Sequence, residues 1–282
     1  MTLYAQWKQE QVVSGSENGY DYVDLGLPSG LKWATCNVGA TAPEGYGDYF
    51  AWGETNPKDN YNWSTYKYCK GSYDTMTKYC TQSSYGTVDN KTTLELSDDA
   101  ARANWGGKWR MPTKAEQDEL RNNCTWTWTT QSGVNGYKVT SKTNGNSIFL
   151  PAAGSRYGTS VGDVGSFGYY WSSSLYESSP GSAYYLYFNS GSVDWYYYYR
   201  YDGHTVRAVC GNNTAAQTFT LTFNANGGTG TMAAQTFEAA FRKRLQLMHS
   251  LALATLSPDG ILMPTAAAPA TPTSKASPSR KI

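Results

Sequence analysis

The segment from Tyr157 to His204 constrains this chain more than any other feature, because tyrosines fill it at irregular spacing. It holds half of the chain's 24 tyrosines, and four of them, Tyr196 to Tyr199, are consecutive. A strand with one buried and one solvated face alternates apolar and polar side chains, so this run does not fit a one-sided strand. Residues of a scaffold type stand between and just after the tyrosines. They are Trp171, Ser172, Ser173, Ser174, Phe188, Val193, Trp195, Arg200, Gly203, Val206 and Arg207.

The irregular positions of this segment have the composition of a binding surface. They carry Tyr, Ser, Gly, Asp, Phe and His, and no Lys, Gln or Met occurs between residues 143 and 213. Antibody paratopes are rich in Tyr, Ser and Gly, since tyrosine gives a large amphipathic contact area at low entropic cost. We therefore expect the segment to bind a variable macromolecular ligand, a protein or a glycan. The candidate ligand-binding residues are Tyr157, Asp163, Phe167, Tyr176, Tyr185, Tyr187, Asp194, Tyr196, Tyr197, Tyr198, Tyr199, Tyr201 and Asp202.

The residue types at the irregular positions are also related through the genetic code. Tyr, Ser, Asp, Gly, His and Phe are all reached from the asparagine codon AAC by changing only its adenines, whereas Lys, Gln, Glu, Met and Trp are not. With asparagine restored, the end of the segment becomes WNNNNRNNG. This resembles the variable region of a diversity-generating retroelement target protein, in which template adenines are mutated during reverse transcription. The alternative is an ordinary tyrosine-rich strand pair, because aromatic residues suit a half-exposed pleated surface.

Composition narrows the class of protein. Charged residues are 16% and aromatic residues 15% of the 282, which suits an extracellular or cell-surface binding domain within a longer parent protein better than a cytosolic enzyme. The net charge is +1, so no nucleic-acid partner is expected. No apolar run approaches the ~20 residues of a membrane span, so no direct membrane insertion is expected either. The start of the chain lacks the basic region and apolar core of a signal peptide.

The middle of the chain, residues 20–212, is expected to form one α+β domain. Residues 20–34 alternate in hydrophobicity on either side of the turn Pro28-Ser29-Gly30, which predicts a β-hairpin. Farther along, Asn144-Gly145 lies between two apolar runs, and this pair of residues favours a tight turn between strands.

Two helices and one long insertion complete the expected domain. Residues 97–103 combine a capping serine, two acids and alanines, which predicts a helix. Thr113 and Glu116 have the spacing of a capping box and open a second helix, which is expected to end near Asn123. Residues 55–93 are polar and poor in aliphatic side chains, so we expect them to form a long surface insertion.

The two ends of the chain resemble parts of one small module. Residues 1–8 resemble the last strand of the Listeria–Bacteroides repeat, a β-grasp-like module of bacterial surface proteins, and residues 9–19 would be a linker. Residues 213–237 resemble the first hairpin of another copy, because the apolar residues of FTLTF alternate before the turn residues Asn-Gly-Gly. The resemblance implies partial β-grasp-like fragments at both ends.

Residues 238–282 depart from the repeat. A coding DNA sequence written for the expected repeat, when translated one base later, encodes Met248 to Gly260 without a mismatch. We therefore interpret this tail as frameshifted repeat DNA, and we expect it to be disordered. The alternative is an amphipathic helix over residues 238–256 that binds a partner.

Six motifs resemble one known family and occur in its order. They are VDLGLPSGLKWATCNVGA, GDYFAWGE, NWGGKWRMPTKAEQDEL, SIFLPAAGSR, GYYWSSS and HTVRAV. Together they resemble the C-type-lectin-fold surface domain of gut Bacteroidetes called the Fibrobacter succinogenes major paralogous domain. That domain is similar to retroelement-diversified variable proteins and, more distantly, to formylglycine-generating enzymes. The resemblance implies a C-type lectin-like fold of the formylglycine-generating-enzyme-like variant for residues 20–212, with its variable segment at about 157–204. It also implies that Arg110 and Arg207 belong to the scaffold.

The same residues argue against catalysis. A formylglycine-generating enzyme needs a reactive cysteine pair late in the domain, where this chain has only Cys210. The two histidines, His204 and His249, provide little for acid–base chemistry. We therefore predict no enzymatic activity and no catalytic residue.

Metal binding and disulfide bonding are not predicted from the residue spacing. The chain has no DxDxDG loop, so we expect no metal site and no cofactor, although calcium, which many lectin folds bind, stays an open alternative. Cys69 and Cys80 occur in similar contexts, and spacing does not decide whether they pair or remain buried thiols. Two rival functions also stay open: an invariant lectin-like adhesin that binds glycans, and a structural surface module whose tyrosines only pack.

Overall fold

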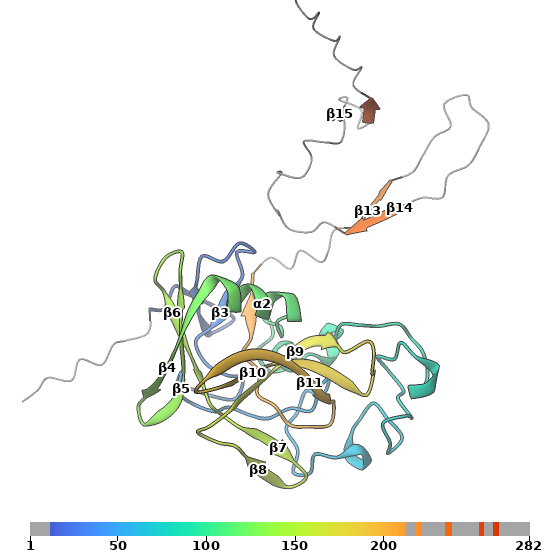
Figure 1. The fold of residues 1–282 in the computed structure, drawn as a ribbon, viewed down its shortest axis with the longest axis horizontal. Coiled ribbons are helices and arrows are strands. Elements are labelled where there is room, and N and C mark those ends of the chain that lie inside the picture. Colours follow the sequence, from blue (N-terminus) through green and yellow to red (C-terminus); the bar gives the residue numbers. More distant parts are fainter. Residues whose placement is uncertain (1–11, 212–217, 222–234, 239–253, 257–261, 265–282) are drawn as a thin grey trace, which may run out of the picture. The chain divides into compact units, whose positions relative to one another are not determined.

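The structure, a computed structural model, describes residues 12–211 and four short segments, 218–221, 235–238, 254–256 and 262–264. The chain divides into two compact units, Met1–Thr214 and Ala215–Ile282. The larger unit is mixed and mostly β, with few helices (Figure 1). The β-rich content expected from the sequence is confirmed.

Within residues 12–211, the strands form four antiparallel sheets. One sheet has the order β1-β2-β3-β12, comprising Gly15–Glu17, Tyr20–Asp24, Lys32–Ala34 and Val209–Cys210. The second has the order β4-β5-β6, comprising Cys124–Gln131, Val134–Ser141 and Ser147–Pro151. The third has the order β11-β10-β9, in which β9 is Gly168–Leu175, β10 is Ser182–Asn189 and β11 is Ser192–Tyr199. The fourth pairs β7, Ser155–Tyr157, with β8, Ser160–Gly162.

The helices are short, and both α-helices have side-chain caps. In α1, Ala100–Trp105, the Asp99 carboxylate accepts from the Arg102 backbone N–H at 3.0 Å, so the helix begins later than predicted. In α2, Lys114–Asn123, the Thr113 and Glu116 capping box is present as predicted. Three 3-10 turns occur at Trp63–Thr65 (η1), Ser83–Tyr85 (η2) and Leu96–Asp98 (η3). Within the residues that the structure describes, no helix has the length and apolar character to cross a membrane.

The hairpins predicted from local sequence are present. Strands β2 and β3 pair antiparallel with Tyr22 opposite Ala34, as expected from the turn between them. Strands β5 and β6 also pair across the Asn144-Gly145 turn, where Gly145 has a φ of 78°. This positive φ suits glycine, which has no Cβ to clash with the backbone.

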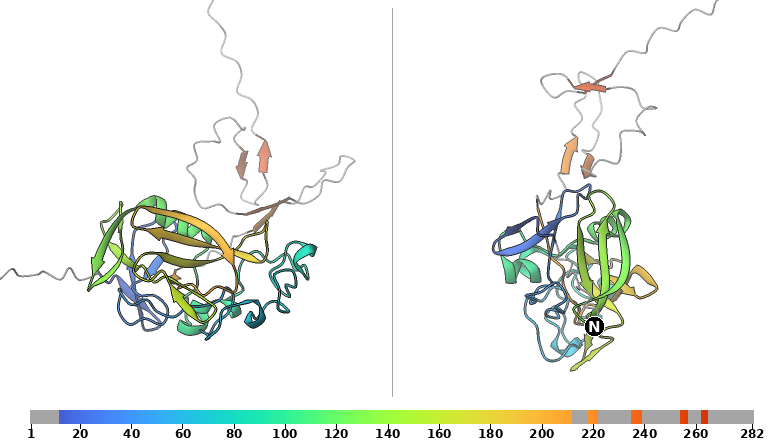
Figure 2. Two further views of the ribbon diagram at one scale, coloured as in Figure 1. Left: turned by 60° about the horizontal axis from the view of Figure 1, so that its bottom comes forward. Right: turned by 90° about the vertical axis from the view of Figure 1, so that its left-hand side faces the viewer.

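Sheet β9–β11 lies between two hydrophobic cores. On one side Tyr170, Leu186 and Phe188 pack with sheet β4–β6, helix α2 and Trp33. On the other side Trp171 and Ala183 pack with Trp52, α1 and residues of the 55–93 segment. Successive residues of a strand point to opposite faces, so side chains of this sheet pack on both sides. Figure 2 shows the ribbon from two further directions.

Two alternate tryptophans of β4 pack against aromatic rings. Trp126 and Trp128 are half-buried and lie on one face of the strand. Both contact the rings of Tyr137 and Phe188, at centroid distances between 5.2 and 6.5 Å.

The expectation of a surface insertion at residues 55–93 is wrong in one respect. The segment is irregular, but Tyr61, Tyr66, Tyr68, Met76 and Tyr79 are buried in the core. The low aliphatic content did not predict this burial, because tyrosine rings supply the apolar area here. Their hydroxyls bond to the protein interior.

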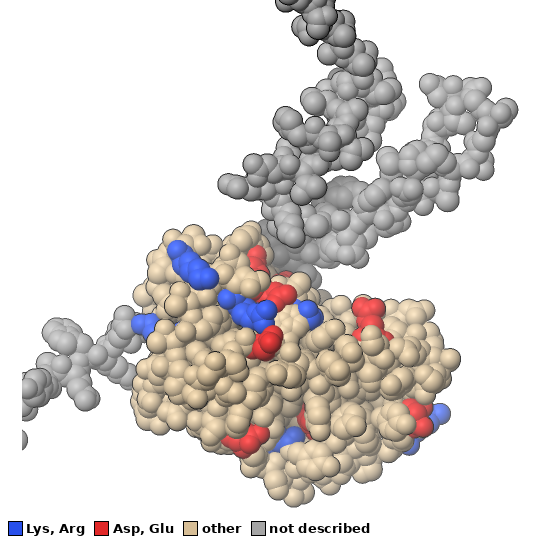
Figure 3. All heavy atoms as spheres, viewed as in Figure 1, with Lys and Arg blue, Asp and Glu red and all other residues tan. Residues whose placement is uncertain are grey.

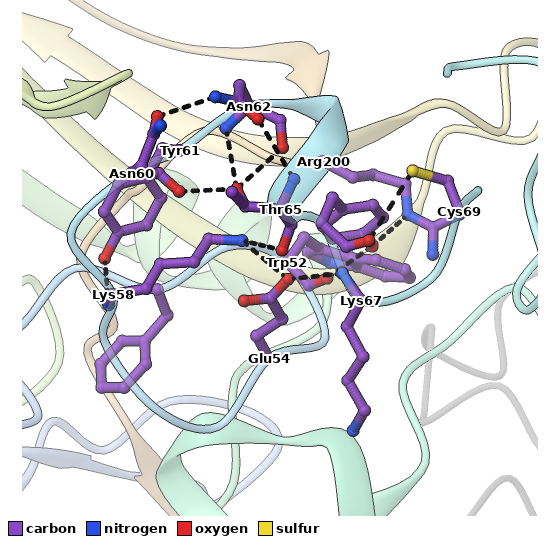
Figure 4. A network of polar contacts seen from close by, with 12 residues as sticks. Trp52, Glu54, Lys58, Asn60, Tyr61, Asn62, Thr65, Lys67, Cys69 and Arg200 are labelled. Atoms are coloured by element: carbon purple, nitrogen blue, oxygen red, sulfur yellow. Dashed lines mark hydrogen bonds and ion pairs between the residues drawn. The ribbon is translucent and has the colours of Figure 1, made fainter. Parts of the chain in front are cut away.

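Arg200 holds the insertion against the end of β11. Its guanidinium is fully buried and donates to the Tyr66 hydroxyl at 2.7 Å and to the carbonyls of Lys78, Tyr79 and Pro180 at 2.9 to 3.2 Å. It also stacks over Trp52 at 4.8 Å. Figure 4 shows this neighbourhood, where Glu54 accepts from the Lys58 ammonium and from the Lys67 backbone N–H.

Arg207, farther along the chain than Arg200, also joins distant parts of the fold. It is 1% exposed and donates to Asn37 Oδ1 and to the carbonyls of Ala34, Thr35 and Phe149, at 2.9 to 3.1 Å. These acceptors come from the β3 region and from β6, so one guanidinium joins two sheets. The scaffold role expected for Arg207 is confirmed, and Arg110 likewise pairs with Glu116 of α2.

The second unit is described only in part. Strand β13, Thr218–Leu221, pairs antiparallel with β14, Gln235–Glu238, and Phe219 lies opposite Phe237. Strand β15, Ala254–Leu256, pairs with β16, Leu262–Pro264. The interpretation of residues 238–282 as a frameshifted, disordered tail stays a prediction. The strand predicted at residues 1–8 lies outside the described residues.

Arg207 provides a test of this architecture. Arg207→Leu leaves four buried acceptors without their donor, so we expect the free energy of unfolding to fall by about 3 kcal/mol or more. Urea denaturation followed by tryptophan fluorescence measures the loss. The control is Arg102→Leu on the surface of α1, which we expect to stay within about 0.5 kcal/mol of the wild type. Equal midpoints for Arg207→Leu and the wild type would contradict the structural role.

Candidate ligand-binding face

The four consecutive tyrosines lie on an edge strand. Strand β11 pairs with β10 on one side only, and Tyr196, Tyr197, Tyr198 and Tyr199 are 51%, 48%, 49% and 41% exposed. Because alternate residues of a strand point to opposite faces, the four rings are divided between the two faces of the sheet. An edge strand exposes side chains on both faces, which explains how four tyrosines in a row are accommodated. The exposure expected for them is confirmed.

One group of rings, the sheet cluster, covers one face of sheet β9–β11. Its members, which lie on neighbouring strands or on the loop before β9, are Phe167, Tyr169, Tyr185, Tyr187 and Tyr196. The Tyr187 ring lies 5.1 Å from that of Tyr196 and 5.6 Å from that of Tyr169. The Tyr169 hydroxyl donates to Asp163 Oδ2 at 2.8 Å. Offset and edge contacts of this kind stabilise aromatic pairs and hold the rings in place.

A second group, the edge cluster, lies at the C-terminal end of β11. It comprises Trp63, Tyr157, Tyr198, Tyr199 and Tyr201. Trp63 contacts Tyr201 at 4.7 Å and Tyr199 at 5.5 Å. Tyr157 of β7 is 65% exposed and contacts Tyr201 at 5.9 Å. Strand β7, the η1 turn and the end of β11 thus meet at one group of rings.

The third group lies on the other face of the sheet, beside α2. Tyr197 stacks on Tyr176 with centroids 3.6 Å apart, and Tyr184 contacts Tyr176 and Trp195. The Lys114 ammonium lies 3.0 Å from the centroid of the Trp195 ring, an attractive cation–π contact. This helix-side cluster lies on the opposite face of the sheet from the sheet cluster.

The predicted single face is therefore only partly present. Tyr157, Asp163, Phe167, Tyr187, Tyr196, Tyr198 and Tyr199 belong to the side formed by the sheet and edge clusters, or contact it. Together with Tyr169 they are called the tyrosine face below. Tyr176 and Tyr197 lie in the helix-side cluster. Asp194 is bound there as well, because the Arg121 guanidinium of α2 donates to its Oδ1 at 2.6 Å.

Three predicted surface residues are buried instead. Tyr185, Tyr201 and Asp202 are 8%, 5% and 5% exposed. Tyr185 belongs to the central strand β10, which has neighbours on both sides. Tyr201 and Asp202 follow the end of β11, where the chain turns into the core. Conversely, Trp195 was expected to be buried but is only half-buried, since it lies on the edge strand under Lys114.

Two buried polar groups beneath the tyrosine face lack hydrogen-bond partners in the described part of the chain. They are the Asp202 Oδ1 atom and both ring nitrogens of His204. His204 is 2% exposed and lies 4.2 Å from Trp171, 4.9 Å from Tyr185 and 5.2 Å from Tyr169, measured between ring centroids. The sequence interpretation of His204 as a diversified or turn residue missed this buried stack.

Burial determines the charge of these two groups. It raises the pKa of Asp202 to about 8 and lowers the pKa of His204 to about 3, because an interior that holds little water penalises the charged form of each. At neutral pH His204 is therefore uncharged and Asp202 is mostly protonated. Burial raises the pKa values of Tyr185, Tyr198 and Tyr201, and the charge of an ionised Asp202 raises them further.

Charged side chains are sparse on the side of the molecule that Figure 3 draws. In the view of Figure 3, most visible atoms of the described residues belong to neither acidic nor basic side chains. Among those residues, no three His, Cys, Asp or Glu side chains gather as metal ligands would. Asp99 caps α1 and accepts from the Met111 backbone N–H at 2.7 Å.

The described cysteines are free thiols. Cys69 donates to the Trp63 carbonyl at 3.2 Å, and Cys80 donates to the Gln82 carbonyl at 3.1 Å. The two thiols bond to different carbonyls, so the pairing left open by their spacing is not present. Cys210 is buried, and burial raises the pKa of its thiol to about 12.

Sequence reasoning missed several members of the ring groups. Trp63 comes from the insertion, far from the tyrosine-rich segment, and no local pattern links it to Tyr201. Tyr169 stands in the GYYWSSS motif and Tyr184 stands between motifs, and neither was among the candidate ligand-binding residues. The sequence did contain a signal for Tyr169. It precedes Trp171 by two residues, so the two side chains lie on the same face of the strand.

Asp202 predicts a dependence of stability on pH. Its folded pKa, about 8, lies above the unfolded value of 3.8, so folding retains a proton that the unfolded chain has released. The contribution of Asp202 to the free energy of unfolding is fully present below pH 3.8. It is lost as the pH rises toward 8. Between pH 7 and 8.5 we expect the free energy of unfolding to fall by about 1 kcal/mol. His204, whose pKa is lowered, opposes this effect only below its unfolded value of 6.5.

Urea denaturation at pH 7.0 and 8.5 measures this change. In Asp202→Asn the fall should be absent and the protein should be more stable than the wild type at pH 8.5. Asp163→Asn, at an exposed acid of the same face, is the matched control and should keep the fall. A wild type and an Asp202→Asn protein with the same pH dependence would refute the assignment.

The comparisons with known proteins provide no relative from which to interpret this face. No family model, no curated protein and no solved structure matches this chain. The lectin-like fold and the family resemblance inferred from the motifs accordingly stay predictions.

Proposed function

We propose that this chain is a surface-displayed ligand-binding protein, that its larger unit has a C-type lectin-like fold, and that a retroelement diversifies its tyrosine face. One observation carries the proposal. Within a single segment, exposed tyrosines at irregular positions alternate with deeply buried scaffold residues. Tyr157, Tyr196 and Tyr198 are 49% to 65% exposed, whereas Trp171 and Arg207 are at most 1% exposed. A surface that varies needs this separation, because changes at exposed positions leave the core packing intact.

The geometry favours recognition over catalysis. Tyrosine rings supply contact area and hydroxyls at low entropic cost, which is the physical basis of antibody recognition. The rings of the face are braced by mutual contacts and by the Tyr169–Asp163 hydrogen bond, so the face is preorganised. The functional groups usual for acid–base or nucleophilic chemistry, His204 and Cys210, are buried in the scaffold. The site therefore supports binding of a macromolecular ligand.

The location proposed for the protein follows from the sequence resemblance. A domain flanked by repeats of bacterial surface proteins would be displayed outside the cell as part of a longer parent. The low charged fraction, 16%, suits this setting. Under this proposal the partner is a protein or glycan presented on another surface, which the domain reaches without inserting into a membrane.

Tolerance to substitution is the first expected outcome. In a display library, we expect Tyr157, Tyr196 and Tyr198 to accept most residue types with no loss of folded protein, since exposed substitutions usually change stability by less than about 0.5 kcal/mol. Trp171 and Arg207 should accept few. The measurement is retention of each variant after heating, scored by sequencing. Similar intolerance at both sets of positions would favour the structural-module alternative, in which the tyrosines only pack.

The neighbouring DNA tests diversification itself. We expect a reverse transcriptase gene and a near-repeat of the segment with AAC or AAT at the codons of the exposed tyrosines. Sequencing of the parent locus provides the observation. A locus with neither element would leave an invariant adhesin as the better description, and a glycan array on the full chain would then show whether exposed rings such as Tyr157 stack on sugars.

A further inference from the structure

Asp202 is an acid that the fold places beneath the tyrosine face without a counter-charge. It is 5% exposed, and its Oδ1 atom is buried without a hydrogen-bond partner in the described part of the chain. Its position is well determined: its backbone N–H donates to the Tyr199 carbonyl at 3.1 Å, and the following Gly203 pairs with Arg156 through two backbone hydrogen bonds. Removing a carboxyl group from water without a partner costs free energy that folding alone does not recover.

The other buried charges of the same unit are compensated. Arg200 and Arg207 donate to carbonyls and side chains at several points each. Asp99 accepts from two backbone N–H groups, and Asp98 accepts from the Lys78 ammonium and the Tyr79 hydroxyl. Asp202 therefore differs from Asp98 and Asp99, the other buried aspartates of this unit, in having a carboxylate oxygen without a partner in the described part of the chain. An unsatisfied buried acid in a proposed binding face is a candidate for contact with the ligand.

The basic side chains nearest in sequence are engaged elsewhere. Arg200 points into the core and binds the Tyr66 hydroxyl. Arg156 lies over the rings of Tyr49 and Tyr61 at 5.8 and 6.0 Å. Neither forms an ion pair with Asp202, whose raised pKa has burial as its cause. A positive charge for Asp202 must therefore come from outside.

The surroundings of Asp202 favour a cation. Asp202 follows Tyr201 in the chain and its backbone N–H bonds to Tyr199, so it lies beside the aromatic rings of the edge cluster, whose faces attract positive charge. His204, uncharged because burial lowers its pKa to about 3, adds no repulsion. Tyr157 and Tyr198 are 65% and 49% exposed, so a ligand can reach their rings.

We propose that the tyrosine face takes a cationic side chain of its ligand, a guanidinium or ammonium group, which pairs with Asp202 among Tyr185, Tyr198 and Tyr201. This inference rests on the proposed binding function and specifies its ligand as a protein or peptide segment with an exposed Arg or Lys. The cation passes between the rings of Tyr157 and Tyr198 and reaches the carboxylate. The pairing supplies the partner that Asp202 lacks in the free protein.

A consequence is proton release. Asp202 is mostly protonated in the free protein at neutral pH, and pairing with a cation requires the carboxylate, so binding strengthens as the pH rises from 6.5 to 8.5. The titratable groups that face Asp202 are Tyr185 of β10, Tyr198 of β11 and Tyr201, and the pKa of each is raised above its ordinary value of 10. None of them ionises in this range.

The test uses the full chain and two probes of the same shape, acetyl-arginine amide and the uncharged acetyl-citrulline amide. Binding is followed by NMR shifts of tyrosine ring signals. We expect the arginine probe to bind at least tenfold more tightly than the citrulline probe, with the largest shifts at Tyr198 and Tyr201. Asp202→Asn, which preserves the side-chain shape, should abolish the preference. Asp59→Asn, at an exposed acid outside the tyrosine face, should retain it.

The outcomes separate this inference from the proposed function. Equal binding of both probes at Tyr198 would overturn the cation proposal and leave ligand binding at the tyrosine face standing. Absence of any shift at the tyrosine face would overturn the cation proposal as well, and diversification would still be decided by the DNA locus. An Asp202 carboxyl that titrates below its usual range in the free wild type, but not in Arg156→Gln, would show an internal ion pair and also overturn it. Circular dichroism confirms that each variant is folded.

Discussion

The structure depends on one fully buried stretch of chain, residues 200–210, and on the two arginines within it. Backbone groups of this stretch bond to Phe50 and Trp52, to Tyr169 and Trp171, and to Ala34 and Val38. The Arg200 and Arg207 guanidiniums add bonds to carbonyls from regions that are distant in sequence. A guanidinium carries five donors in a fixed plane, so it can satisfy several buried carbonyls at once. The sheets and the insertion are thus assembled around a single segment.

This arrangement determines what the tyrosine face can be. Strand β11 ends where the buried stretch begins, so the exposed rings are attached directly to the most constrained part of the molecule. The rings can therefore be rigidly presented although they lie on an edge strand. Under the proposed function, residue changes on β11 alter the surface but not the backbone that carries it. The edge itself is a liability for aggregation, and twisted, half-covered rings limit its exposure.

The same stretch also explains why the binding face contains polar groups that stability alone would not retain. Asp202 and His204 lie between residues that must be buried, so their side chains are buried as well. Each loses hydration, and in the described part of the chain Asp202 Oδ1 and the His204 nitrogens gain no hydrogen bond in return. In the proposed role this loss is offset when a ligand supplies the missing charge. Asp202 then lowers the stability of the free protein and contributes to binding of the ligand.

The sequence by itself determined the features that depend on neighbours in the chain. The Thr113 capping box, the hairpin turn at Asn144-Gly145 and the tyrosine-rich composition all act over a few residues, and the structure contains them where expected. Only the tertiary structure decided which tyrosines are exposed, because the pattern of β11 does not show that it is an edge strand. Trp63 and Asp202 acquired their roles in the same way. Burial and pairing of such residues depend on contacts between distant segments, and local patterns carry no information about those contacts.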